Sequence, residues 1–224
     1  MSLSELGERT GGLTAQQEAY LYLQDQIVSG ALPGGTPIIS EHVAKALQIS
    51  RMPVREAIRQ LHAEGFITIR PNRSAIVTPR SPEQLVELIE MRAALEGLAI
   101  RLAVPNVTNQ VIGELRFKAS GLRGSSFNHL ELVQRHDDFH DYLCSICMRP
   151  RLAHELRQIR LAERPYIRKY TKSHSSIERP GYEHDLLIDA LEKRDPDHAE
   201  RLLREHIMIN AYGISSKYYS CTEK

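Results

Sequence analysis

The strongest constraint on the fold is a run of three short helical patterns followed by two apolar alternations, all within the first 80 residues. Thr14 and Gln17 have the spacing of a capping box, and the helical pattern that follows them stops at Gly30. After the turn-rich stretch 33–37, Ser40 can cap a second, shorter helix. The chain is therefore predicted to begin with two helices joined by a tight connection.

A third helix is predicted after a turn at Gln48 and Ile49. Ser50 can cap this helix, and Pro53 lies in its first turn, where a missing amide hydrogen costs little. Gly65 ends it in the position that glycine usually takes after a helix. The predicted buried face consists of Val54, Ala57, Ile58 and Leu61.

The two apolar alternations, residues 66–69 and 75–78, flank the turn 71–74 and predict a β-hairpin. Three helices and a hairpin form a winged helix-turn-helix, whose third helix has the right size for the DNA major groove. We therefore expect residues 1–80 to form a DNA-binding domain with the hairpin as its wing.

Arginines gather on the predicted exposed side of the third helix and at the wing. Arg51, Arg55 and Arg59 are four residues apart, and Arg73 lies at the tip of the wing. Guanidinium groups in these places can reach guanine edges or phosphates. Any one of these arginines alone would more often serve solubility, but their joint placement favours DNA contacts. Residues 45–80 hold seven basic and two acidic residues, although the whole chain has a net charge of only +1.

This segment resembles the GntR family of regulators. The family pattern Ser-Arg-x-Pro-Val-Arg-Glu-Ala-Leu, then Leu-x-x-Glu-Gly, then Pro-Asn-Arg-Gly-Ala-x-Val, is matched by residues 50–58, 61–65 and 71–77. The resemblance implies operator contacts by Arg51 and Arg55 and a wing role for the segment around Arg73. Met52 replaces a small polar residue and Ser74 replaces the wing glycine, so we expect an altered operator preference.

The composition of the chain indicates a cytoplasmic protein with a substantial core. Of its 224 residues 42% are hydrophobic, and its longest apolar runs are far shorter than the roughly 20 residues of a membrane helix. The N-terminus lacks the apolar stretch of a signal peptide. The three cysteines, Cys144, Cys147 and Cys221, are too few for a disulfide scaffold and are predicted to be reduced thiols, the first two buried on a helix face.

Beyond a short linker at Ser81 and Pro82, helical periodicity continues almost without interruption. The fold is therefore predicted to be mainly α, with an all-helical bundle over residues 81–224. The first helix of this bundle carries an apolar stripe: Leu85, Leu88, Ile89, Met91, Leu95, Leu98, Ala99 and Leu102. Further helices are predicted over about 107–122, 127–148, 151–170, 182–193 and 196–213.

Eight of the ten histidines lie from His129 onward. His136 and His140 are four residues apart on one predicted helix, and His184 and His206 lie on two later helices. Four neutral imidazoles that converge inside a bundle form a site for a divalent transition metal, with zinc, nickel, iron and manganese all chemically possible. A metal-free packing cluster of core histidines is the alternative.

This half resembles the effector domain of the fatty-acid-regulator branch of the GntR family. Its landmarks here are Glu90-x-Arg92-x-x-x-Glu96 and the pattern from Glu183-His184 to His206. Many members of this branch bind a metal through an Asp-x-x-Phe-His motif and one histidine from each of the last two helices, which implies His140, His184 and His206. The aspartate position holds His136, with Asp137 next to it. Either residue can be the fourth ligand, and we favour His136 because it shares a helix face with His140.

The same resemblance implies a small organic acid as effector, beside the metal. Arg92 can pair with its carboxylate, although a salt bridge to Glu96 is an equally good interpretation, and Arg149 stands where the family often has asparagine. The chain is therefore predicted to be a homodimeric regulator, not an enzyme, that binds double-stranded operator DNA and has no membrane partner. A metal-dependent hydrolase-like domain fused to a DNA-binding module, and a metal-free ligand sensor, are the alternatives.

Overall fold

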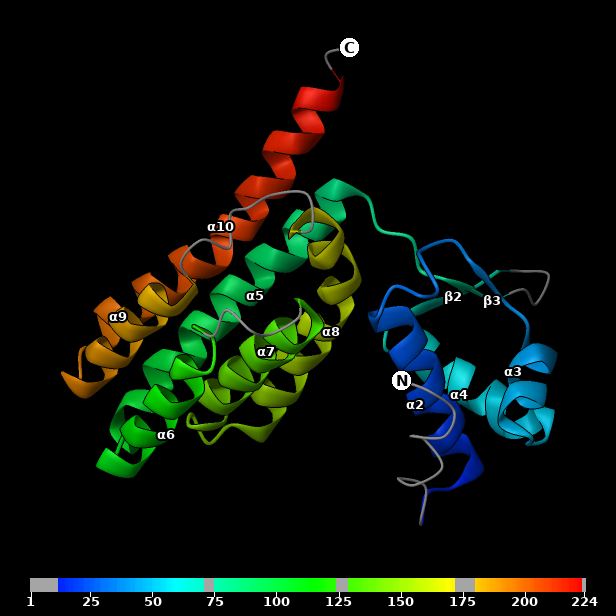
Figure 1. Ribbon diagram of the computed structural model, residues 1–224, viewed down its shortest axis with the longest axis horizontal. Coiled ribbons are helices and arrows are strands. Elements are labelled where there is room, and N and C mark those ends of the chain that lie inside the picture. Colours follow the sequence, from blue (N-terminus) through cyan, green and yellow to red (C-terminus); the bar gives the residue numbers. More distant parts are fainter. Residues whose placement is uncertain (1–11, 71–74, 124–128, 172–179, 223–224) are drawn as a thin grey trace. The chain divides into compact units, whose positions relative to one another are not determined.

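The computed structural model describes residues 12–70, 75–123, 129–171 and 180–222. The chain divides into two compact units, residues 1–80 and 81–224, shown in Figure 1. The mainly α fold, with an N-terminal winged helix-turn-helix and a C-terminal helical bundle, is confirmed. Among the described residues, no helix is long and apolar enough to cross a membrane.

The first unit packs three helices against a small antiparallel sheet in which β3 lies between β1 and β2. Thr14 forms the predicted capping box with Gln17. Gln48 has a left-handed backbone, with φ of 57°, and turns the chain between the second and third helices. The elements are α2 (Ala15–Val28), β1 (Pro37–Ile38), α3 (Ser40–Leu47), α4 (Arg51–Ala63), β2 (Ile67–Ile69) and β3 (Ala75–Val77).

Three local predictions for this part of the chain were wrong. Pro37 and Ile38 form a strand, because they pair with Ile76 and Ala75 of β3, a non-local contact that the turn-rich sequence does not reveal. Ser40 is the first residue of α3 and not its cap. The expected linker at 81–82 is the start of a helix, where Ser81 makes a capping box.

The second unit is helical throughout its described residues. Its elements are α5 (Pro82–Ala103), the short 3-10 helix η1 (Val104–Asn106), α6 (Asn109–Ser120), α7 (His129–Ser145), α8 (Pro150–Thr171), α9 (Pro180–Glu192) and α10 (Pro196–Thr222). The last helix continues past Gly213, where the sequence predicted its end.

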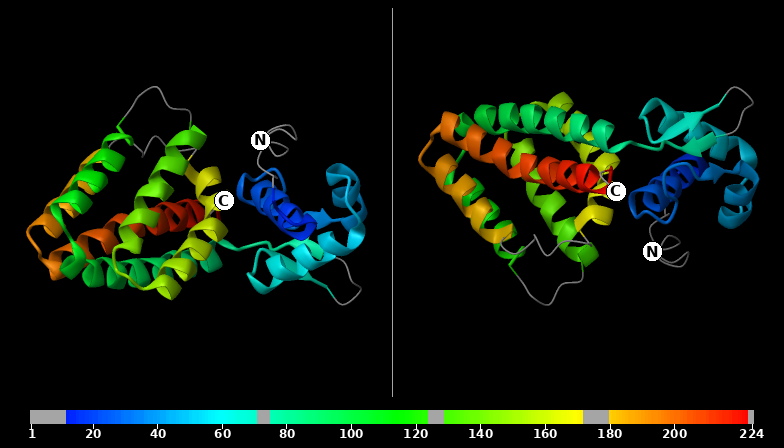
Figure 2. Two further views of the ribbon diagram at one scale, coloured as in Figure 1. Left: turned by 90° about the horizontal axis from the view of Figure 1, so that it is seen from below. Right: turned by 90° about the horizontal axis from the view of Figure 1, so that it is seen from above.

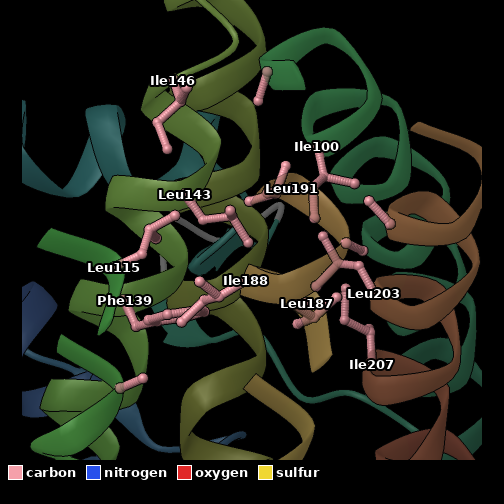
Figure 3. Packing of buried hydrophobic residues seen from close by; sticks show 14 of the residues in the cluster. Ile100, Leu115, Phe139, Leu143, Ile146, Leu187, Ile188, Leu191, Leu203 and Ile207 are labelled. Atoms are coloured by element: carbon pink, nitrogen blue, oxygen red, sulfur yellow. The ribbon is translucent and has the colours of Figure 1, made fainter. Parts of the chain in front are cut away.

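Helix α10 packs along α5, as the views in Figures 1 and 2 show. Gly97 lies at this contact, where a Cβ would be 3.0 Å from Cγ of Arg204, so the Arg204 side chain would have to shift to admit one. The buried core of this unit lies among α5, α6, α7, α9 and α10, and its largest side chains include Phe139, Leu143 and Ile188 (Figure 3). The core therefore adjoins the histidines of α7, because Phe139 precedes His140.

The predicted apolar stripe of α5 was wrong at two positions. Met91 and Leu98 are 53% and 43% exposed, whereas Arg92 and Glu96 are buried. A charged side chain is rarely buried unless an opposite charge pairs with it. Arg92 and Glu96 both have such partners on another helix. Hydrophobic periodicity alone therefore assigned part of this helix to the wrong face.

Candidate functional site

The exposed face of α4 carries positive charge at helical intervals. Arg51, Arg55 and Arg59 are all exposed, and Met52 between the first two is 60% exposed. The opposite face is buried against the rest of the unit and consists of the predicted residues Val54, Ala57, Ile58 and Leu61. The helix thus offers a continuous basic surface that a polyanion can contact.

Two of these arginines already have acidic neighbours. Arg51 pairs with Glu41 of α3 at 2.7 Å, and Arg59 pairs with Glu56 at 2.7 Å. No ion pair joins Arg55 to any residue that the structure describes. Exposed pairs of this kind contribute little free energy, so the arginines can exchange them for phosphate or base contacts.

Ser50 and Arg73 complete the predicted DNA-contacting set. Ser50 occupies the N-cap position of α4 with an extended backbone, but its side chain makes no capping hydrogen bond. The prediction that this hydroxyl caps the helix was therefore wrong, and the hydroxyl can bond to another group. Arg73 lies outside the described residues.

In the second unit, four histidines from three helices converge. His136 and His140 come from α7, His184 from α9 and His206 from α10. One ring nitrogen of each lies within 4.8 Å of the others, and Nε2 of His136 is 3.4 Å from Nε2 of His206. The centroids of neighbouring rings are separated by 4.5 Å to 5.7 Å. We call these four residues the histidine cluster.

Two carboxylates orient rings of the histidine cluster from outside. Nδ1 of His140 donates to Oε2 of Glu96 at 2.8 Å, and Nδ1 of His206 donates to Oε2 of Glu183 at 2.6 Å. A carboxylate acceptor fixes the proton on Nδ1, which leaves the lone pair on Nε2. The buried Nε2 of His140 has no hydrogen-bond partner among the described residues. This arrangement fits a metal ion, which would accept that lone pair.

Burial keeps His136 and His140 uncharged at neutral pH. It lowers the pKa of His140 to about 4, even though Glu96 acts in the opposite direction. Burial, reinforced by the neighbouring His140 and His184, lowers the pKa of His136 well below its usual range. Neutral imidazole is the form that binds metal ions.

Glu96 is the centre of a buried ionic network around the cluster. Besides His140 it contacts Arg160 at 2.6 Å and Arg92 at 3.2 Å, and Arg92 reaches Glu163 at 2.6 Å. Burial raises the pKa of the Glu96 carboxyl, but its interactions with His140 and Arg92 outweigh that effect and hold the pKa well below its usual range. The predicted Arg92–Glu96 salt bridge is therefore present, and Glu163 is a second partner.

The structure separates Asp137 from the histidine cluster. Asp137 forms an ion pair with Arg164 of α8, and its carboxyl is not among the groups that converge. Arg149 is exposed ahead of α8, where its guanidinium approaches the carbonyl of Met148 at 3.5 Å. Within the described part of the chain, no hydrogen bond or ion pair joins Arg149 to the four histidines.

Two cysteines, Cys144 and Cys147, are free and buried. Burial raises the pKa of the Cys144 thiol, and Arg160 lies 3.8 Å from its sulfur. A buried thiol with a raised pKa is a poor nucleophile, so Cys144 acts as a packing group. Cys147 is buried in the same cluster of side chains.

Sequence reasoning missed three members of the network: Glu96 as a partner of His140, and Arg160 and Glu163 as partners of α5. The partners of α5 on α8 are 64 and 71 residues away along the chain, so no local spacing connects them. The one available signal was the i,i+4 pair of Arg92 and Glu96.

Two family models match this chain. The model "Bacterial regulatory proteins, gntR family" covers residues 15–77, and the FCD domain model covers residues 87–208. A "Probable D-xylose utilization operon transcriptional repressor" of Paenarthrobacter nicotinovorans is 29% identical over 81% of this chain and 80% of its own length. The "HTH-type transcriptional repressor RspR" of Escherichia coli K12 is 29% identical over 85% of both chains.

Solved structures agree in fold. McbR/YncC of E. coli has a TM-score of 0.79 at 23% identity and covers 92% of this chain and 99% of its own. A putative GntR transcriptional regulator from Rhodococcus sp. RHA1 has a TM-score of 0.73 at 20% identity, with 90% and 97% covered. The proteins that this chain resembles are transcriptional regulators and not enzymes.

Proposed function

The chain belongs to the GntR family of bacterial transcriptional regulators, with an FCD domain as its second unit, and from this premise we propose that it represses transcription as a cytoplasmic homodimer bound to operator DNA. In this proposal residues 1–80 bind DNA, and residues 81–224 bind the effector and form the dimer. The observation that carries the DNA-binding role is the exposed row of arginines on α4.

The DNA contacts that we propose come from the N-terminal end of α4 and from the wing. Arg51 and Arg55 lie in the major groove, Arg59 and Ser50 approach the backbone, and Arg73 contacts the neighbouring minor groove or phosphate. A two-fold symmetric dimer would read an inverted repeat with one α4 in each half-site.

A gel-shift assay on the DNA beside the protein's own gene tests this role. We expect a salt-sensitive complex that Arg51→Ala weakens, because this change removes a guanidinium that can contact a base edge or phosphate. Arg151→Ala is the matched control, since Arg151 is an exposed arginine of the second unit. Failure to bind any inverted repeat would contradict the proposal, and a mass measurement in solution decides whether the protein is a dimer.

For the second unit we propose that the histidine cluster binds a divalent transition metal, namely zinc, nickel, iron or manganese. The support is the convergence of four ring nitrogens within 4.8 Å and the hydrogen bonds that direct two Nε2 lone pairs inward. A bound metal of this kind would supply a Lewis-acidic position beside the ring nitrogens. His136, His140, His184 and His206 would hold the ion, and Glu96 and Glu183 would keep the rings of His140 and His206 oriented.

We further propose that a small organic acid binds beside the metal and changes operator affinity. Arg92 is close enough to the cluster to lower the pKa of both His136 and His140, so its positive charge would also attract an anionic effector. Arg149 is exposed, so it would contact the effector only at the edge of such a site.

Elemental analysis of protein purified without an affinity tag tests the metal. We expect stoichiometric metal in the native protein and its loss in His140→Ala and His206→Ala, with His154→Ala as an exposed histidine control. Native protein that holds no metal after incubation with these ions would support the metal-free sensor instead.

Calorimetric titration with small mono- and dicarboxylic acids tests the effector. Arg92→Lys keeps the positive charge but loses the bidentate guanidinium, so it should weaken binding of the acid.

A further inference from the structure

The histidine cluster contains nitrogen donors only. Three carboxylates of the surrounding helices have other partners: Glu96 accepts from His140 and Arg160, Glu183 accepts from His206, and Asp137 pairs with Arg164. No carboxylate belongs to the convergent group found among the described residues. Any ion held there would therefore meet imidazole nitrogen and no carboxylate of the described residues.

His136 is the residue that makes all four donors of the cluster imidazole nitrogens. It lies one helical turn before His140, and the centroids of their rings are 4.5 Å apart. Its Nε2 is 3.4 Å from Nε2 of His206, so it faces the other ring nitrogens from the position where the family resemblance leads us to expect an aspartate. The neighbouring carboxylate of Asp137 does not replace it, because Arg164 holds that group.

Donor type determines which divalent ions such a site prefers. Imidazole nitrogen suits zinc, nickel, copper and iron, whereas carboxylate and water oxygens suit manganese, magnesium and calcium. The affinity of a given nitrogen site also rises from manganese through nickel to copper and then falls at zinc. A site of four imidazoles without a carboxylate should therefore bind Mn²⁺ more weakly than the other candidate ions.

We infer that His136 makes this site selective for late transition ions such as Zn²⁺ and Ni²⁺ and against Mn²⁺. The inference rests on the proposed metal binding and narrows it, because manganese leaves the set of four candidate ions. His136 is a specificity-determining ligand in this account, while His140, His184 and His206 supply the affinity that any divalent transition ion would use.

Competition titrations of the chelator-stripped, full-length protein test the inference. Zn²⁺, Ni²⁺ and Mn²⁺ are titrated separately against a chromophoric chelator, and the ratio of the Mn²⁺ to the Zn²⁺ association constant is compared among variants. We expect a small ratio in the native protein and a rise of about tenfold or more in His136→Asp, since the new carboxylate is an oxygen donor. His154→Asp, which introduces the same charge at an exposed position of α8, should leave the ratio unchanged.

His136→Asp introduces a charge at a partly buried position and could fail to fold, so a second variant is measured as well. His136→Asn offers an amide oxygen without the charge and should raise the ratio in the same direction by a smaller factor. Circular dichroism establishes which variants fold. The absorption spectrum of the Co²⁺-loaded protein gives an independent readout, since replacing one nitrogen ligand by oxygen shifts its visible bands.

The outcomes separate this inference from the proposed function. A native protein that binds none of the three ions contradicts the metal-binding proposal itself. A native protein that binds Mn²⁺ as tightly as Zn²⁺, or a ratio and Co²⁺ spectrum unaffected in both His136 variants, overturns the selectivity inference and leaves metal binding in place.

Discussion

The exposed face of α4 and the histidine cluster both depend on ionisable side chains, but they place these side chains in opposite environments. On α4 the arginines are exposed, and their ion pairs with Glu41 and Glu56 lie at the surface. Around the cluster, Arg92 is buried and forms ion pairs with the buried Glu96 and Glu163. Surface charge is available to a partner, whereas buried charge holds the protein's own groups in position, so substitutions in the two regions should have different consequences.

The largest expected effect is the loss of Glu96. Glu96→Ala leaves Arg160 and Arg92 buried without a full complement of negative charge, and we expect it to lower the free energy of unfolding by about 3–5 kcal/mol. Chemical denaturation measures this change. Asp197→Ala removes the exposed partner of Arg101 in the same unit and should cost no more than about 1 kcal/mol. If both substitutions lowered the free energy of unfolding by the same amount, the claim that the buried ion pairs stabilise the fold more than the exposed ones would be wrong.

Acidification should also destabilise the metal-stripped protein through the buried histidines. The pKa of His140 is lowered from 6.5 to about 4 in the folded state, so the unfolded chain takes up this proton first as the pH falls. The free energy of unfolding should therefore decrease between pH 6.5 and pH 4. His140 alone accounts for at most about 3–4 kcal/mol of this decrease, and His136 acts in the same direction.

Urea titrations across this pH range measure the effect. His140→Gln cannot titrate and should flatten the dependence, while His154→Gln, at an exposed position, should retain it. A free energy of unfolding that stays constant from pH 6.5 to pH 4 would show that burial does not lower the pKa of His140 in the folded protein.

Arginine substitution on α4 should affect DNA binding and leave the fold intact. Arg55→Ala removes an exposed side chain with no ion pair to a described residue, so we expect the unfolding free energy to change by no more than about 0.5 kcal/mol. Operator affinity should fall by about 1–3 kcal/mol if the guanidinium contacts a base edge. Fluorescence anisotropy with a labelled operator measures this, and a loss of stability that matches the loss of affinity would argue for a structural role.

The smallest expected effect concerns the Arg51–Glu41 pair. Glu41→Ala removes an exposed ion pair, and we expect a stability change of less than about 1 kcal/mol in thermal unfolding. Because a negative charge next to the DNA-contacting face is removed, affinity for DNA should increase slightly at low salt. Weaker binding in this variant would instead indicate that Glu41 positions Arg51.

The two regions also differ in how far the sequence predicted them. The helices and wing of the first unit follow from local signals such as the capping box at Thr14 and the glycine after α4, because each element is determined by residues close together in the chain. The two-residue strand β1 was missed, because its only cause is pairing with β3.

In the second unit the sequence predicted the four histidines, with His136 and His140 selected by helical spacing and His184 and His206 by their places on two later helices. It did not predict the groups that orient their rings. Glu96 lies 44 residues before His140, and Arg160 lies 64 residues after Glu96. Such contacts depend on how α5, α7 and α8 pack together, which hydrophobic periodicity does not specify. The same limitation placed Met91 in the predicted buried stripe, although its side chain is largely exposed.

The central claim is that the exposed arginines of α4 bind operator DNA, and the salt dependence of that binding tests it most directly. Binding of the native protein and of Arg55→Ala to the DNA beside its own gene is measured from about 50 to about 200 mM salt. The account predicts that the logarithm of the association constant falls linearly with the logarithm of salt concentration. If Arg55 contacts a phosphate, the slope becomes shallower by about one unit in Arg55→Ala. Binding that is independent of salt, or identical in the native protein and the variant in both affinity and slope, would contradict it.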